Sequence, residues 1–107
     1  MPYDEKLDEY ITSIVSDWGT THKKMFGGTC HLLNGNMMCG VYGQYLILRL
    51  GEESAGEAIG QPHVKAFDVT GRPMKGWVMV DRSVLTQSAL LKWLRRAREF
   101  VLTLPPK

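Results

Sequence analysis

Two cysteines, Cys30 and Cys39, are the residues of this 107-residue chain whose type and spacing point most directly to chemistry. They flank Asn34-Gly35, a strong signal for a β-hairpin, because both residues of its tight turn need positive φ. A two-residue turn places Cys30 directly opposite Cys39, where Cα atoms approach to about 4.5 Å, within disulfide range. The spacing predicts a candidate thiol redox pair. The alternative is two small apolar side chains in a core, and a register shifted by one residue would place them on opposite faces.

The histidines do not form a recognisable metal-ligand pattern. Zinc sites usually contain closely spaced ligand pairs, whereas Cys30 and His31 are adjacent in sequence and would point to opposite faces of a strand. We expect His22 and His63 to lie in loops. The sequence therefore predicts no metal site and no cofactor.

Catalytic motifs are also missing from the sequence. It contains no G-x-S-x-G elbow, no H-E-x-x-H pair and neither of the common glycine-rich phosphate loops. We therefore expect a protein that is not an enzyme and has no catalytic residues.

Basic residues gather near the end of the chain, on the polar face of a predicted helix. These residues are Lys92, Arg95, Arg96 and Arg98. They form a candidate nucleic-acid or partner surface, because such cations can neutralise phosphates or acidic side chains. The alternative is a solvated face, since cations late in a helix complement its dipole.

Composition bounds the class of protein. Hydrophobic residues make up 44% and charged residues 22%, and the formal net charge is only +2. These values are ordinary for a globular domain and do not indicate a polycation. The acidic N-terminus is unlike a secretory signal, and no apolar run is long enough for a membrane span. We expect one domain over residues 1–107 in a reduced, cytoplasmic, bacterial-type protein.

The periodicity of apolar residues predicts an α+β fold. Helices are expected from Leu7 to Trp18 with Asp4 as N-cap, over Ser54–Ile59 with a capping box, and after Thr86 until Pro105-Pro106; strands are expected as three segments between Phe26 and Leu50, at Val64–Val69 and at Gly76–Asp81. The order is α-β-β-β-α-β-β-α. It favours two layers, an antiparallel five-stranded sheet with helices on one side.

Several of these segments resemble the TfoX (Sxy) N-terminal domain family. The resemblance rests on the "MFGG" element, the "NGNMMCGVYGQYLILRL" hairpin, Phe67, the Gly71-Arg72 turn, the "WVMV" strand and the closing amphipathic helix. It implies a secretion-chaperone-like fold and supplies no catalytic residues. Full-length members regulate bacterial competence for DNA uptake with the transcription machinery, and carry a second domain similar to a helix-hairpin-helix module. The sequence ends at Lys107 without that module, so we expect a stand-alone domain.

Together these observations predict an interaction domain involved in transcriptional or competence regulation through a protein partner. Two alternatives remain open. One is direct nucleic-acid binding through the basic face of the last helix, and the other is a redox switch at Cys30 and Cys39. Exposed sheet edges and oppositely charged chain ends also make a homodimer a reasonable expectation.

Overall fold

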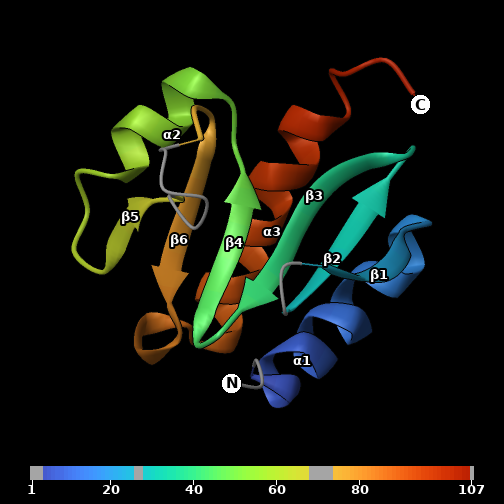
Figure 1. Cartoon of the computed structure of the whole chain (residues 1–107), viewed down its shortest axis with the longest axis horizontal. Coiled ribbons are helices and arrows are strands. Elements are labelled where there is room, and N and C mark those ends of the chain that lie inside the picture. Colours follow the sequence, from blue (N-terminus) through green and yellow to red (C-terminus); the bar gives the residue numbers. More distant parts are fainter. Residues whose placement is uncertain (1–3, 26–27, 68–73, 107) are drawn as a thin grey trace.

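The computed structural model describes residues 4–25, 28–67 and 74–106. In this part of the chain the helices are α1 (Glu5–Val15), α2 (Glu52–Ala58) and α3 (Gln87–Val101), and short 3-10 turns occur at Ser16–Trp18 and Arg82–Val84. The strands are β1 (Thr21–Met25), β2 (Gly28–Leu33), β3 (Asn36–Tyr42), β4 (Tyr45–Arg49), β5 (Val64–Ala66) and β6 (Trp77–Asp81) (Figure 1). The strands form one antiparallel sheet in the order β1-β2-β3-β4-β6-β5. The predicted α+β antiparallel class is confirmed.

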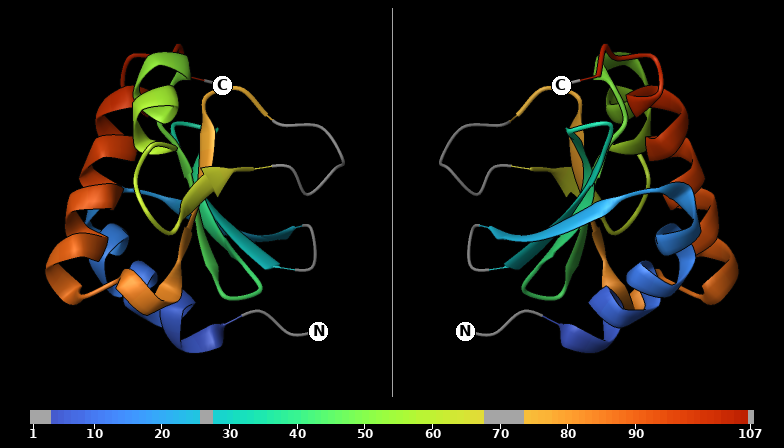
Figure 2. Two further views of the ribbon diagram at one scale, coloured as in Figure 1. Left: turned by 90° about the vertical axis from the view of Figure 1, so that its left-hand side faces the viewer. Right: turned by 90° about the vertical axis from the view of Figure 1, so that its right-hand side faces the viewer.

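The helices lie on one side of the sheet (Figure 2). Apolar residues of all three helices share a core with the sheet face beneath them, for example Ile11 of α1, Ala58 of α2 and Leu94 of α3. A smaller cluster on the other side of the sheet gathers Ile47, Phe67, Trp77 and Met79. Because the larger core couples every helix to the sheet, it fixes where the helices present their polar faces.

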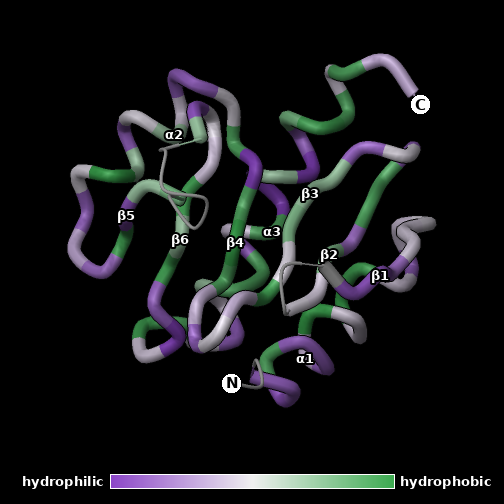
Figure 3. The backbone as a smooth tube through the Cα atoms, viewed as in Figure 1, coloured by the Kyte–Doolittle hydropathy of each residue, from purple (hydrophilic) through white to green (hydrophobic). Residues whose placement is uncertain are grey.

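The sheet has six strands, so the expectation of five is wrong. The missed strand is β1, which pairs with β2 from Thr21 opposite Leu32 to Met25 opposite Gly28. Its sequence, THKKM, lacks the apolar alternation that indicates a half-buried strand, and Figure 3 shows it as largely hydrophilic. β1 is an edge strand, where exposed lysines are common because they discourage pairing with other chains. His22, expected in a loop, therefore lies in a strand.

The first hairpin turn is confirmed, but its register changes a few residues away. Asn34 and Gly35 adopt φ of 54° and 80°, and Leu33 pairs with Asn36. A bulge then shifts the pairing, so that His31 pairs with Cys39, and Cys30 pairs with Gly40. The predicted Cys30–Cys39 pairing is wrong.

The bulge has a packing reason. Met38 and Cys39 are consecutive in β3, yet both are fully buried in the core that the helices cover. A regular strand would turn one of them to the opposite face, whereas an extra residue lets both face inward. The shift buries the Met38 side chain and separates the two cysteines onto opposite faces of the sheet.

Local predictions about helix ends have mixed outcomes. The N-caps Asp4 and Thr86 are confirmed, since each side chain accepts a backbone N–H three residues on. The capping box at Ser54 is wrong, because α2 begins earlier and its N-cap, Gly51, uses no side chain. The end of the predicted strand at Val64–Val69 and the turn at Gly71-Arg72 lie outside the described residues, as does Phe26.

We expect Gly40→Ala to lower the free energy of unfolding by at least about 2 kcal/mol. A Cβ built at Gly40 would lie 2.1 Å from the backbone oxygen of Thr29, which cannot move without breaking the sheet. Urea unfolding followed by circular dichroism measures the change. The matched control is Gly56→Ala in α2, where a Cβ meets nothing within 4 Å. It should instead stabilise by about 0.5–1 kcal/mol, and equal effects of the two substitutions would contradict the packing account.

Candidate functional site

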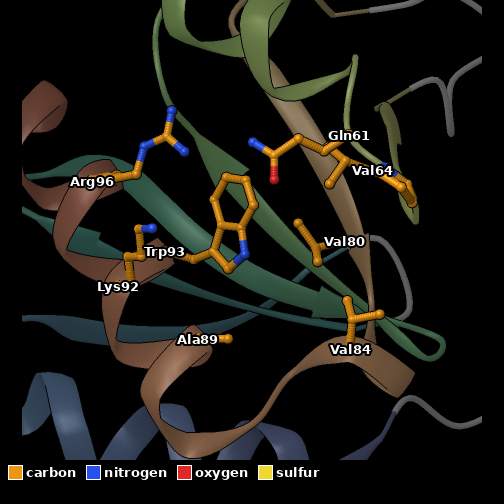
Figure 4. Close-up of a pocket in the computed structure, with 9 residues that line it drawn as sticks. Gln61, Val64, Val80, Val84, Ala89, Lys92, Trp93 and Arg96 are labelled. Carbon is orange, nitrogen blue, oxygen red and sulfur yellow. The ribbon is translucent and has the colours of Figure 1, made fainter.

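A groove of about 290 Å³ lies between α3 and the segment that connects α2 to β5. Figure 4 shows Lys92 and Arg96 along the helix wall, Gln61 and Val64 on the opposite wall, and the Trp93 indole projecting between them. The residues that line it are Gln61, Pro62, Val64, Val80, Val84, Ala89, Lys92, Trp93 and Arg96. The groove therefore has an apolar floor and a polar rim.

The charges at this rim are of one sign. Lys92 and Arg96 are one helical turn apart, and none of the described residues that line the groove is a carboxylate. The Arg96 guanidinium lies 4.8 Å from the centre of the Trp93 ring, within the range of a cation–π contact. The groove combines positive charge with an aromatic surface. A ligand with an acidic group next to an apolar group would match this combination.

The structure does not bring all four predicted basic residues into this groove. Arg98 lies on the flank of α3 that faces the N-terminal helical segment, with its guanidinium 5.0 Å from the ring centre of Trp18. Arg95 is exposed on the outer face of α3. The predicted surface is therefore divided between a groove that holds Lys92 and Arg96 and two cations outside it.

A second polar site lies at the opposite edge of the sheet, around the carboxylate of Asp8. The Nε2 atom of His31 lies 2.9 Å from Asp8 Oδ1, and the Nε2 atom of His22 lies 3.1 Å from Oδ2. The Thr29 hydroxyl donates a hydrogen bond to Oδ1 at 2.7 Å. The two imidazole rings are stacked with their centres 4.7 Å apart. One carboxylate thus joins α1 to β1 and β2.

The environment of this cluster sets its charge. Burial alone would raise the pKa of Asp8, but the hydrogen bonds from Thr29 and His31 and the charges of the nearby histidines outweigh it and lower the pKa below its usual value. Burial lowers the pKa of His31, although the hydrogen bond to Asp8 opposes that shift. The carboxylate is therefore ionised at neutral pH and can only accept hydrogen bonds, so each Nε2 carries the hydrogen in these two contacts.

Sequence patterns did not reveal this cluster. Asp8, His22 and His31 offer donor atoms that all lie within 4.8 Å of one another, and together they could hold a metal ion. They are separated by 14 and 9 positions, on a helix and two strands, one of which carries no strand signal. The signal in the sequence is the polar pair Thr29 and His31, which lie two positions apart and therefore share one face of β2. In the structure both side chains hydrogen-bond to Asp8 of α1.

The two cysteines do not form the site that the sequence suggested. Cys39 lies in the core beneath the helices, and Cys30, paired with Gly40, faces the other side of the sheet. Burial raises the pKa of both thiols above the ordinary value. The redox hypothesis thus loses the opposed geometry on which it was built.

A comparison with known protein families identifies the chain. The model of the TfoX N-terminal domain matches residues 14–101. The chain belongs to the TfoX N-terminal domain family. This family is linked to the regulation of competence. The match includes His22 and His31 and all of α3, whereas Asp8 precedes it. No curated protein and no solved structure matches the chain.

None of the helices in the described segments is long and apolar enough to cross a lipid bilayer.

We expect both thiols to resist alkylation in the native protein, because each side chain is fully buried and its thiolate form is disfavoured. Mass spectrometry after treatment with N-ethylmaleimide should show little labelling of Cys30 or Cys39 until urea is added. Mild oxidation with diamide should leave the native mass unchanged. A rapid intramolecular disulfide in the folded state would contradict the observed register.

Proposed function

We propose that this domain is a non-enzymatic interaction module of competence regulation that binds an acidic segment of a protein partner in the α3 groove. The family's link to competence supplies the process. The groove supplies the contact surface, since Lys92 and Arg96 flank an aromatic and aliphatic floor.

The proposal rests mainly on the charge of the groove: among the described residues that line it there are two cations and no carboxylate. Positive potential there favours an anionic partner and penalises a cationic one. Tryptophan and arginine are the residues that most often dominate binding energy at protein interfaces. At about 290 Å³ the groove is large enough for one or two side chains of a peptide, and it falls at the lower limit for a small-molecule pocket.

Nucleic-acid binding through the same helix is the rival hypothesis. Phosphate contacts add up along a backbone, so affinity grows with the number of cations on one continuous surface. The four candidate cations are divided, because Arg98 packs over Trp18 while Lys92 and Arg96 border the groove. An apolar floor between the cations also fits amino-acid side chains better than a phosphate backbone. These features favour a protein partner.

The test begins with selection from a display library of random peptides on the immobilised domain. We expect enriched peptides that combine Asp or Glu with an aliphatic or aromatic residue. Binding of the best labelled peptide is then measured by fluorescence anisotropy. Lys92→Glu with Arg96→Glu should weaken it at least about tenfold, because two favourable charge contacts become repulsive.

The matched control reverses Lys6 and Lys24, two exposed lysines outside the groove. Each pair of reversals changes the net charge from +2 to −2, since two substitutions remove two positive charges and add two negative ones. The control should bind the peptide as the wild type does. If both variants lost the same amount of affinity for the peptide, the effect would come from the overall charge of the protein, and this result would overturn the proposal. So would tighter, steeply salt-dependent binding to a labelled DNA duplex, which would favour the rival hypothesis.

A further inference from the structure

Three potential metal ligands converge from three elements at the β1 edge of the sheet. Asp8 comes from α1, His22 from β1 and His31 from β2, and Figure 1 shows α1 lying alongside these two strands. The two imidazoles address different oxygens of the same carboxylate, at 3.1 Å from His22 and 2.9 Å from His31. Because both imidazole rings point their Nε2 atoms at the carboxylate of Asp8, the donor atoms of the three residues lie close together.

We propose that Asp8, His22 and His31 form a binding site for a divalent transition-metal ion of the zinc class. Imidazole nitrogens suit zinc, cobalt, nickel and iron, whereas calcium and magnesium take oxygen ligands. Three protein ligands leave one position of a tetrahedral ion open, as in sites that hold a water molecule or an exchangeable group. The site is separate from the α3 groove, so it goes beyond the proposed function.

The spacing of the donor atoms fits such an ion. With metal–ligand bonds of about 2.0–2.1 Å, ligand atoms around a tetrahedral ion are roughly 3.3 Å apart. The nitrogen–oxygen distances of 2.9 and 3.1 Å, which run to different oxygens of Asp8, are slightly shorter, and one donor atom from each residue lies within 4.8 Å of the other two. To complete the coordination, the side chains would have to close the longest of these separations by up to about 1.5 Å.

The surroundings hold the ligands in place. The Thr29 hydroxyl donates to Asp8 Oδ1, and such outer contacts orient a ligating carboxylate. The His31 side chain is 1% exposed, so neighbouring atoms restrict its ring. The stacked ring of His22 restricts it further. A ligand set that is already ordered loses little conformational freedom when the ion binds.

The cluster also has an entrance. The His22 side chain is 44% exposed, whereas those of Asp8 and His31 are 10% and 1% exposed. An ion can therefore reach the cluster from solvent on the His22 side. On binding, each imidazole would coordinate through Nε2 as the neutral ring with one proton on Nδ1, and the proton displaced from Nε2 would pass to solvent. The ion would take the place of the two N–H hydrogen bonds that the carboxylate accepts in the metal-free protein.

A bound ion would fasten α1 to the two outermost strands at this edge. It would stabilise the folded state, because a ligand that binds only the native form adds its binding free energy to folding. The family match does not assign this role, since Asp8 lies before residue 14, where the match begins.

The test uses Co²⁺ as the probe and Zn²⁺ as its competitor, with the purified 107-residue chain. We expect one equivalent of Co²⁺ to produce the visible absorption of a tetrahedral site, and Zn²⁺ to displace it. His22→Ala should weaken binding by more than about tenfold, since it removes a direct ligand. It should also reduce the rise in melting temperature that Zn²⁺ gives the wild type. Because His22 is partly exposed, this variant should keep the melting temperature of the metal-free wild type within a few degrees.

The matched control is His63→Asn, which removes the third histidine. His63 is exposed, lies outside the cluster and has a φ of 65°, a conformation that asparagine tolerates. This variant should bind Co²⁺ like the wild type. The proposal is overturned if Co²⁺ produces no tetrahedral absorption, if a thiolate charge-transfer band shows that cysteine binds it, or if His63→Asn weakens binding as much as His22→Ala.

Discussion

The carboxylate of Asp8 is the interaction on which the β1 edge of this fold depends. It is almost completely buried and accepts hydrogen bonds from Thr29 and His31 of β2 and from His22 of β1. A buried charge costs several kcal/mol unless it is paired and hydrogen-bonded, so these partners are a condition for its presence. In return, the carboxylate links α1 to an edge strand that has few apolar residues of its own. The same atoms supply the proposed metal ligands.

The α3 groove is built differently. α3 packs on the central strands β3 and β4 through Leu94, Ala97 and Val101, which are fully buried, and presents Lys92 and Arg96 at its flank. Apolar burial positions these cations, so their charges remain available for a partner. Because β1 and β5 are the opposite edges of the sheet, the proposed metal site and the proposed docking groove lie apart. A change in one can therefore be studied without altering the residues of the other.

Sequence patterns predicted the parts of the fold in which local signals and apolar burial agree. The Asn34-Gly35 turn, the Asp4 and Thr86 caps and the stripe on α3 belong to this group. The patterns failed where buried polar groups replace apolar ones. Thr29 and His31 are polar, yet they face the helices because both hydrogen-bond to Asp8. The register predicted by counting back from the turn was wrong because the bulge that buries Met38 shifts the pairing. Sequence patterns did not indicate the cluster of Asp8, His22 and His31, because these residues contact one another only after α1, β1 and β2 have assembled.

Asp8 holds the β1 edge in place through its hydrogen bonds to His22, Thr29 and His31. The decisive experiment is hydrogen exchange of the backbone amides in Asp8→Ala. Removing the carboxylate leaves buried donors without an acceptor, at a cost of about 1–3 kcal/mol, which corresponds to roughly a 5-fold to 150-fold increase in local opening. We predict faster exchange of this size in β1, with β4 and β6 retaining their protection. Unchanged exchange in β1, or equal loss across the whole sheet, would contradict the claim.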